Sequence, residues 1–249
     1  MYDEPAPELP FLPVRRPVLP IERVGAVVEA VLCSGFPTQL LLVMIMATVG
    51  MRLRTADGHL SPPFIFTLSL ADAAVVIGLV LFLLRAHRES ARDVLLGDGR
   101  VLGEALLGIV ILPAVFLLVL LVLGVILTFA PWLHNVPVNP LEDMLRNRRD
   151  ALIFGVVVMV AGGVREEVQR GFILHRFGQY LGGVWWGVGI YSVLFGLGHY
   201  EQGYDAMIAT SILGAAWGTL YLVRRSIVAP MVSHAAFNVA QLAKYFVLR

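Results

Sequence analysis

The chain has 249 residues, of which 58% are hydrophobic and 15% charged, and its mean hydropathy is +0.79. Soluble domains carry about 25% charged residues, so this composition excludes an ordinary soluble protein and predicts an integral, multi-pass membrane protein. The net charge of +1 argues against a nucleic-acid partner, and a single cysteine, Cys33, excludes an internal disulfide.

The first 23 residues are rich in proline and begin with acidic side chains. They lack the basic start, the apolar centre and the cleavage site of a signal peptide. We therefore predict an extended cytoplasmic tail over residues 1–23, ahead of the first membrane helix.

Charge-poor runs divide the rest of the chain, and a helix needs roughly 20 apolar residues to cross a hydrocarbon core about 30 Å thick. Seven runs follow one another: residues 24–50, 64–84, 104–129, 151–177, 184–200, 204–223 and 227–246. They predict an all-α, polytopic transmembrane helical bundle of about seven spans. Residues 24–138 form its N-terminal helices. Residues 139–249 form a core of four spans, whose short connections favour a compact antiparallel bundle.

Arginines near the helix ends indicate the orientation of the bundle, because cytoplasmic loops carry an excess of basic residues. Arginines precede the first run and follow the second and sixth, which places those ends in the cytoplasm and the loop with Glu201 and Asp205 on the opposite side. Arg52 and Arg54 disagree with this orientation, as does the segment 139–150. For that segment we predict an amphipathic interfacial helix with a lipid-facing side formed by Leu141, Met144 and Leu145.

Ionisable side chains inside membrane helices are costly, so they indicate functional sites unless they lie near a helix end. Glu29, Asp72 and Glu104 lie within two or three turns of a span end, which favours an interfacial position for each. Glu166 differs from them, because it lies about 22 Å along a helix that begins at residue 151.

Glu166 and Arg170 are four residues apart and share a helix face. We therefore predict that the arginine holds the Glu166 carboxylate in a fixed orientation, while Glu167 points about 100° away. The alternative interpretation is a charge cluster that ends the span.

Two further spans carry polar side chains at the same spacing. The fifth run contains Phe195 and His199 in "FGLGH", and the seventh contains His234 and Asn238 in "HAAFN". Taken singly, His199 fits an interfacial histidine, and the pair in the seventh run fits hydrogen bonding between helices.

Taken together, these runs bring Glu166 and two imidazoles to comparable depths in the membrane. A carboxylate and a histidine that reach one buried water can remove its proton. A second histidine and an asparagine amide can stabilise the oxyanion that forms when a carbonyl is attacked. The combination predicts peptide hydrolysis without a serine or cysteine nucleophile.

Three stretches resemble the motifs of a known family. "EEVQR" (166–170), "FGLGH" (195–199) and "HAAFN" (234–238) are similar to the EExxxR, FxxxH and HxxxN/D motifs of the CPBP family. This is the CAAX protease and bacteriocin-processing group, also called the ABI family, which includes the type II CAAX prenyl endopeptidases. The resemblance covers residues 139–243, whereas the first three runs match only as apolar helices.

The resemblance implies an intramembrane endopeptidase in the plasma (inner) membrane of a prokaryote, with a catalytic cavity within the last four spans that faces the cytoplasm. It implies that Glu166 and His199 activate the attacking water. His234 and Asn238 would then stabilise the oxyanion. The same resemblance gives a site-shaping role to three more residues, Glu167, Arg170 and Phe195.

Metal dependence is left open by these residues. Glu166, His199 and His234 are a ligand set that could hold zinc with an open position for water. The chain lacks the HExxH pattern that places two ligands and a base on one helix turn. We favour a metal-free mechanism, with zinc as the alternative cofactor.

Two other functions compete with proteolysis. One is a non-proteolytic bacteriocin-immunity or binding protein on the same scaffold. The other is a small proton-coupled transporter, because buried glutamate and histidine are also its expected parts. The expected partners of the endopeptidase are the lipid bilayer and a membrane-anchored or lipidated substrate, with prenylated CAAX tails and bacteriocin leader peptides among the candidates. The oligomeric state is left open.

Overall fold

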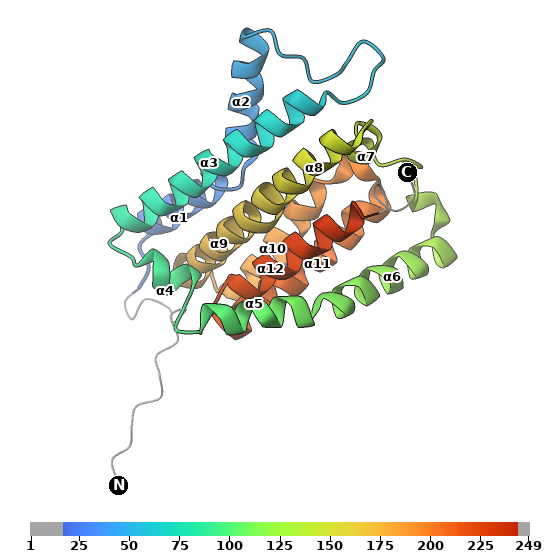
Figure 1. The fold of residues 1–249 in the computed structure, drawn as a ribbon. Helices are drawn as coiled ribbons and strands as arrows, with labels where there is room; N and C mark the ends of the chain where they lie inside the picture. Colours follow the sequence, from blue (N-terminus) through green and yellow to red (C-terminus); the bar gives the residue numbers. More distant parts are fainter. Residues whose placement is uncertain (1–16, 244–249) are drawn as a thin grey trace.

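The structure, a computed structural model, describes residues 17–243, so residues 1–16 of the predicted tail and residues 244–249 lie outside the described part. Within this part the regular secondary structure is helical apart from one isolated bridge between Arg54 and Leu60, which confirms the all-α prediction (Figure 1). The elements are α1 (Pro20–Leu32), α2 (Phe36–Thr48), α3 (Pro62–Ala86), α4 (Ala91–Leu95), α5 (Val101–Val110), α6 (Leu112–Phe129), η1 (Pro131–Leu133), α7 (Pro140–Asp143), α8 (Arg148–Val157), η2 (Val158–Arg165), α9 (Glu166–Tyr180), α10 (Val184–Leu197), η3 (Tyr200–Gln202), α11 (Tyr204–Arg224) and α12 (Val228–Gln241).

Three helical stretches among the described residues are long and apolar enough to cross a membrane: Pro62–Ala86, Val101–Phe129 and Tyr204–Arg224. A fourth results if α1 and α2, which are bent by 45°, form one span. The chain is therefore an integral multi-pass membrane protein, whereas seven spans stay a prediction. Two of the predicted spans, α10 and α12, have only 14 residues each. At 1.5 Å per residue such a helix is about 21 Å long, shorter than the hydrocarbon core.

A long helical rod made of α8, η2 and α9 runs through the bundle (Figure 1). The π-helix η2 in its middle contacts both α3 and α12, while α9 contacts α10. Phe172 and Leu174 of α9 are fully buried in an apolar core with Leu84 of α3 and Tyr221 of α11. This packing fixes the part of the rod that carries Glu166.

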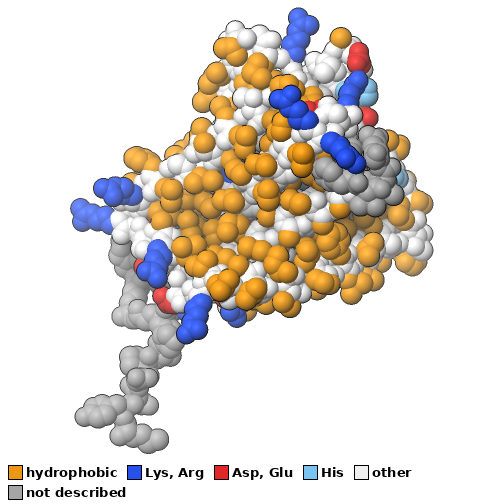
Figure 2. Space-filling model, viewed as in Figure 1, with side chains coloured by type: hydrophobic (Ala, Val, Ile, Leu, Met, Phe, Trp, Pro, Cys, Tyr) orange, Lys and Arg blue, Asp and Glu red, His pale blue; other side chains and the backbone are white. Residues whose placement is uncertain are grey.

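The two ends of the bundle differ. We call the end that holds Ala86, Tyr180 and Arg224 the arginine end, and the end that holds residues 131–147 and 199–203 the loop end (Figure 1). Between them, hydrophobic side chains cover the face in Figure 2, and basic side chains lie toward the ends. This distribution matches a protein whose middle is embedded in lipid.

The segment 139–150 is not the predicted interfacial helix. The helix α7 has only four residues, and the Asn139 and Asn147 side chains cap the starts of α7 and α8. The chain turns between these caps, so Met144 and Leu145 are 1% exposed and pack against Leu60. The prediction that they face lipid is wrong, because helical spacing was extended across a turn.

A buried polar cluster secures the arginine end of α9. Arg176 is fully buried and donates hydrogen bonds to Glu29 Oε2 (2.5 Å) and Glu89 Oε2 (2.6 Å), while His175 Nε2 lies 2.9 Å from Glu89 Oε1. Burial raises the pKa of Glu89, but the hydrogen bonds and charges of His175, Gln179 and Arg176 outweigh it and lower the pKa to about 2. Glu29 is thus an ion-pair partner of α9 as well as a residue near a span end.

Candidate active site

The rod is distorted at the point where the predicted site begins. Residues Val158–Arg165 form a π-helix, a rare conformation that is often found at functional sites. Within it, a Cβ atom on Gly163 would lie 2.6 Å from Ala235 Cβ, and one on Gly162 would clash with Asn238 Nδ2. The two glycines therefore let α12 approach the rod closely. This approach brings the seventh predicted run against the fourth.

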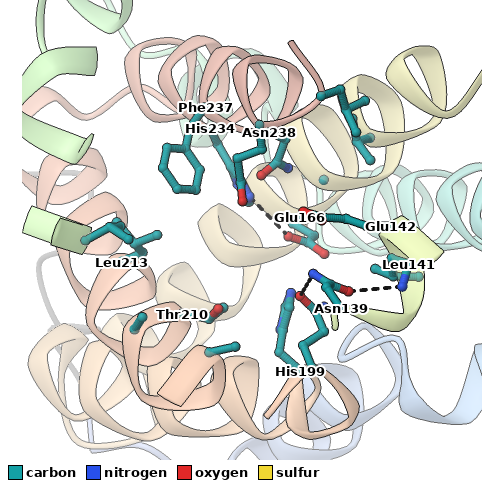
Figure 3. A pocket seen from close by; sticks show the side chains of 18 of the residues that line it. Asn139, Leu141, Glu142, Glu166, His199, Thr210, Leu213, His234, Phe237 and Asn238 are labelled. Atoms are coloured by element: carbon teal, nitrogen blue, oxygen red, sulfur yellow. Dashed lines mark hydrogen bonds and ion pairs between the residues drawn. The ribbon is translucent and has the colours of Figure 1, made fainter. Parts of the chain in front are cut away.

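A cavity of about 670 Å³ extends from Glu166 to the loop end. Five of the predicted site residues line it, and Figure 3 shows four of these around the same space: Glu166, His199, His234 and Asn238, with Phe195 as the fifth. The cavity is also lined by side chains of the loop end, among them His134, Asn139, Glu142, Gln202 and Asp205. The expected convergence of three helices on one cavity is thus found.

His234 is held on both sides of its ring. Its Nδ1 lies 2.9 Å from Glu167 Oε1, and because an ionised carboxylate only accepts hydrogen bonds, Nδ1 carries the proton. Its Nε2 faces Glu166 Oε2 at 3.7 Å. The Trp217 ring stacks on the imidazole with centroids 3.9 Å apart and an interplanar angle of 18°. These contacts fix the orientation and the tautomer of His234.

Arg170 binds Glu167 rather than Glu166. Its Nη1 donates to Glu167 Oε1, both side chains are 1% exposed, and the guanidinium lies 4.8 Å from the centre of the Phe195 ring. The prediction that Arg170 orients Glu166 is therefore wrong. The cause lies in the spacing: residues three apart also share a helix face, so helical geometry alone does not choose between the two glutamates.

The motif itself departs from the family pattern here. "EEVQR" has two residues between the second glutamate and the arginine, whereas EExxxR has three. Both spacings, i to i+3 and i to i+4, place the arginine on the face of the second glutamate. The pairing of Glu167 with Arg170 is therefore compatible with the shorter motif.

Glu166 lies at the cavity wall with its side chain 17% exposed. Its Oε1 is 3.8 Å from Arg165 Nη1, and its Oε2 is the atom that faces His234. The carboxylate thus lies between a cation and an imidazole, and it remains open to a molecule in the cavity.

His199 occupies the opposite side of the cavity (Figure 3). Its Nδ1 is 2.9 Å from the carbonyl oxygen of Phe195, so Nδ1 donates and Nε2 has its lone pair free. Within residues 17–243, no hydrogen bond or ion pair joins His199 to Glu166. Both residues line the same cavity, so a small molecule in it is accessible to each.

The zinc alternative does not fit this arrangement. Among the described residues, no group of three or more histidine, cysteine, aspartate or glutamate side chains is placed to hold a metal ion. Glu166 and His234 are neighbours, whereas His199 lies across the cavity from them, even though the hydrogen bond at its Nδ1 leaves Nε2 available as a ligand atom. We therefore derive no step through a metal.

Two predictions about the orientation of the chain in the membrane conflict at the cavity. The cavity reaches the loop end, and this end also holds the loop with Glu201 and Asp205. That loop was predicted to lie outside the cell, while the cavity was predicted to face the cytoplasm. The two predictions exclude each other.

Several residues of the site were not found from the sequence. Trp217, which supports His234, lies in an apolar helix without a distinguishing pattern. Asp72 was interpreted as interfacial, but it is buried and forms an ion pair with Arg165. The one usable signal was the pair Gly162 and Gly163 directly before the charged segment, since adjacent glycines in a membrane helix indicate close helix approach.

Comparison with known proteins identifies one family. The model of the type II CAAX prenyl endopeptidase Rce1-like family matches residues 148–240, the segment that contains all seven predicted site residues. No curated protein and no solved structure matches the chain.

Proposed function

Residues 148–240 belong to the Rce1-like type II CAAX prenyl endopeptidase family, and from this membership we propose that the chain is an intramembrane endopeptidase. We propose that it hydrolyses a peptide bond of a membrane-anchored substrate with a prenylated, CAAX-type tail. The observation that carries the proposal is the meeting of Glu166, His199, His234 and Asn238 around one cavity.

We propose that Glu166 and His199 activate the attacking water. Each presents an atom able to accept a proton toward the cavity, a carboxylate oxygen in Glu166 and the Nε2 lone pair in His199. A water between them loses a proton to one of the two as its oxygen attacks the scissile carbonyl carbon. When the C–N bond breaks, the leaving amine takes up that proton.

His234 and Asn238 would stabilise the oxyanion. They lie four residues apart on α12, so their side chains reach the cavity from the same helix face. Because Nδ1 of His234 is already directed at Glu167, the ring donates from Nε2 only as an imidazolium. The charged side chains buried around the ring are three carboxylates and two guanidiniums: Asp72, Glu166, Glu167, Arg165 and Arg170.

The cavity wall favours a lipid-attached substrate. Apolar side chains of several helices line it, including Ile65 of α3, Val119 and Leu123 of α6, Phe154 of α8 and Leu213 of α11. Such a wall can bury a hydrocarbon chain, at about 0.8 kcal/mol per CH₂ group. The peptide bond would then lie toward the polar side chains.

We place the loop end in the cytoplasm, as the resemblance to the family implies. This orientation is the opposite of the one predicted from the arginines near the helix ends, which placed the loop with Glu201 and Asp205 outside the cytoplasm. The loop end has basic residues of its own, so it is compatible with a cytoplasmic position: Arg52, Arg54, Arg146, Arg148 and Arg149.

The test uses a peptide that ends in a farnesylated CAAX sequence, with a fluorophore and a quencher on either side of the scissile bond. The purified protein in detergent is expected to cleave this peptide faster than the same peptide without the prenyl group. The Glu166→Gln variant, which keeps the size of the side chain, is expected to cleave both peptides at least about 10²-fold more slowly than the wild type.

A matched control is Glu104→Gln. Glu104 is also a buried acid in an ion pair, with Arg224, but it does not line the cavity. Its variant is expected to cleave at the wild-type rate. Equal cleavage by wild type and Glu166→Gln would overturn the proposed function.

A further inference from the structure

Arg165 connects the site to the N-terminal helices. Its side chain is 8% exposed, and its Nη2 forms an ion pair with Asp72 Oδ2 of α3. Asp72 is itself held by α2, because Thr38 Oγ1 donates to Asp72 Oδ1 (2.5 Å) and Gln39 Nε2 donates to Oδ2 (3.2 Å). Both ends of the Asp72–Arg165 pair are thus fixed inside the bundle.

The backbone between α1 and α2 leaves room for the guanidinium. Gly35 has a φ of +83°, a conformation that favours glycine, and a Cβ atom there would clash with Arg165 Nη2. The turn at Gly35 therefore closes directly over Arg165. Neither Gly35 nor Asp72 belongs to the segment that matches the family model.

The other amino group of Arg165 faces the reacting carboxylate. Arg165 Nη1 lies 3.8 Å from Glu166 Oε1, beyond hydrogen-bond distance, while Glu166 Oε2 faces His234. Arg165 is therefore shared between a fixed carboxylate, Asp72, and one that is open to the cavity. If Asp72 lost its charge, Arg165 would be free to close the gap and bind Glu166 directly.

We propose that Asp72 and Arg165 form a positioning pair that keeps the Glu166 carboxylate turned toward His234 and free to act on water. The inference rests on the proposed function. It assigns to α2 and α3 the control of a site whose reacting groups all lie between Glu166 and Asn238. Asp72 acts through Arg165 and touches no reacting group.

The first test separates turnover from substrate binding. Asp72→Asn is expected to lower kcat about tenfold on the farnesylated peptide while KM stays within about twofold, because a misplaced base slows the chemical step. Arg165→Lys keeps the cation and is expected to retain more activity than Arg165→Gln. The control Glu104→Gln removes a buried acid of a different ion pair and is expected to leave kcat unchanged.

A double variant can be measured if the Asp72 or Arg165 single variant fails to accumulate in the membrane. Asp72→Asn combined with Arg165→Gln leaves no unpaired buried charge, so it removes the cause of misfolding. If the pair served folding alone, this double variant would regain the wild-type kcat, and that result would overturn the inference. A kcat that stays about tenfold low supports positioning.

A second readout needs no substrate, so it separates this inference from the proposed function. Dicyclohexylcarbodiimide modifies protonated carboxyl groups in membrane helices, and peptide mass spectrometry quantifies the labelled fraction of Glu166. Loss of the neighbouring cation in Arg165→Gln is expected to raise this fraction at least about twofold at neutral pH. Labelling equal to that of the wild type and of Glu104→Gln would show that Arg165 does not act on Glu166.

Discussion

Replacement of Glu167 by glutamine tests the buried support of the site. Glu167 is 0% exposed, accepts hydrogen bonds from Arg170 and from His234 Nδ1, and differs from glutamine mainly by its charge. The Glu167→Gln variant leaves the Arg170 guanidinium as a buried cation without its closest counter-charge. It also replaces the acceptor that fixes the His234 tautomer.

The expected cost follows from the burial of the pair. Loss of one partner of a buried ion pair costs about 3–5 kcal/mol. Three rings lie near the guanidinium, with centres at 4.8 Å (Phe195) and 5.8 Å (Tyr191, Trp217), and their electrons partly compensate the orphaned cation. We expect about 3 kcal/mol, which for a chain of this size lowers Tm by roughly 6–12 °C.

The assay is thermal unfolding in detergent, followed by intrinsic fluorescence. Glu104→Gln is the matched control, because its partner Arg224 has a side chain that is 45% exposed and can turn toward water. Its loss of unfolding free energy should be small, about 1 kcal/mol or less, which lowers Tm by no more than about 2–4 °C. A loss of Tm in Glu167→Gln no larger than in this control would show that the buried ion pair of Glu167 and Arg170 does not stabilise the site.

Two further predictions concern the ends of the bundle. The pKa of Glu89 is lowered from its ordinary value of 4.5 to about 2, so its ionised form stabilises the fold above pH 4.5 and this contribution is lost as the pH falls toward 2. The Tm difference between wild type and Glu89→Gln should therefore be constant near neutral pH and shrink between pH 4.5 and 2; a difference as large at pH 2.5 as at pH 7 contradicts it. For orientation, Asp57→Cys at the loop end should resist a membrane-impermeant maleimide in intact cells, whereas Arg88→Cys at the arginine end should react, both in a Cys33→Ala background. The opposite pattern would place the loop end outside.

The sequence predicted the helices of the site and the residues that meet in it. Glu166, His234 and Asn238 lie within helices, where depth follows from counting residues, whereas His199 lies just past the end of α10; all four line one cavity. The all-α class followed from composition, as membrane helices satisfy their own backbone hydrogen bonds.

Contacts between helices distant in the sequence could not be predicted in this way. The pair of Asp72 with Arg165 joins residues 93 positions apart, and no periodicity of either helix indicates the partner. Arg170 shares a face with both glutamates, so only the packing of α12, which brings His234 beside Glu167, selects the partner. The π-helix η2, which contacts α12, was not predicted from the sequence either.

The turnover number of Glu166→Gln on the farnesylated peptide tests whether Glu166 activates the attacking water. Loss of a general base is expected to lower kcat by about 10²–10⁴-fold, while Glu104→Gln, measured beside it, keeps the wild-type value. A Glu166→Gln protein that folds and turns over within about twofold of the wild type would show that Glu166 is not the general base.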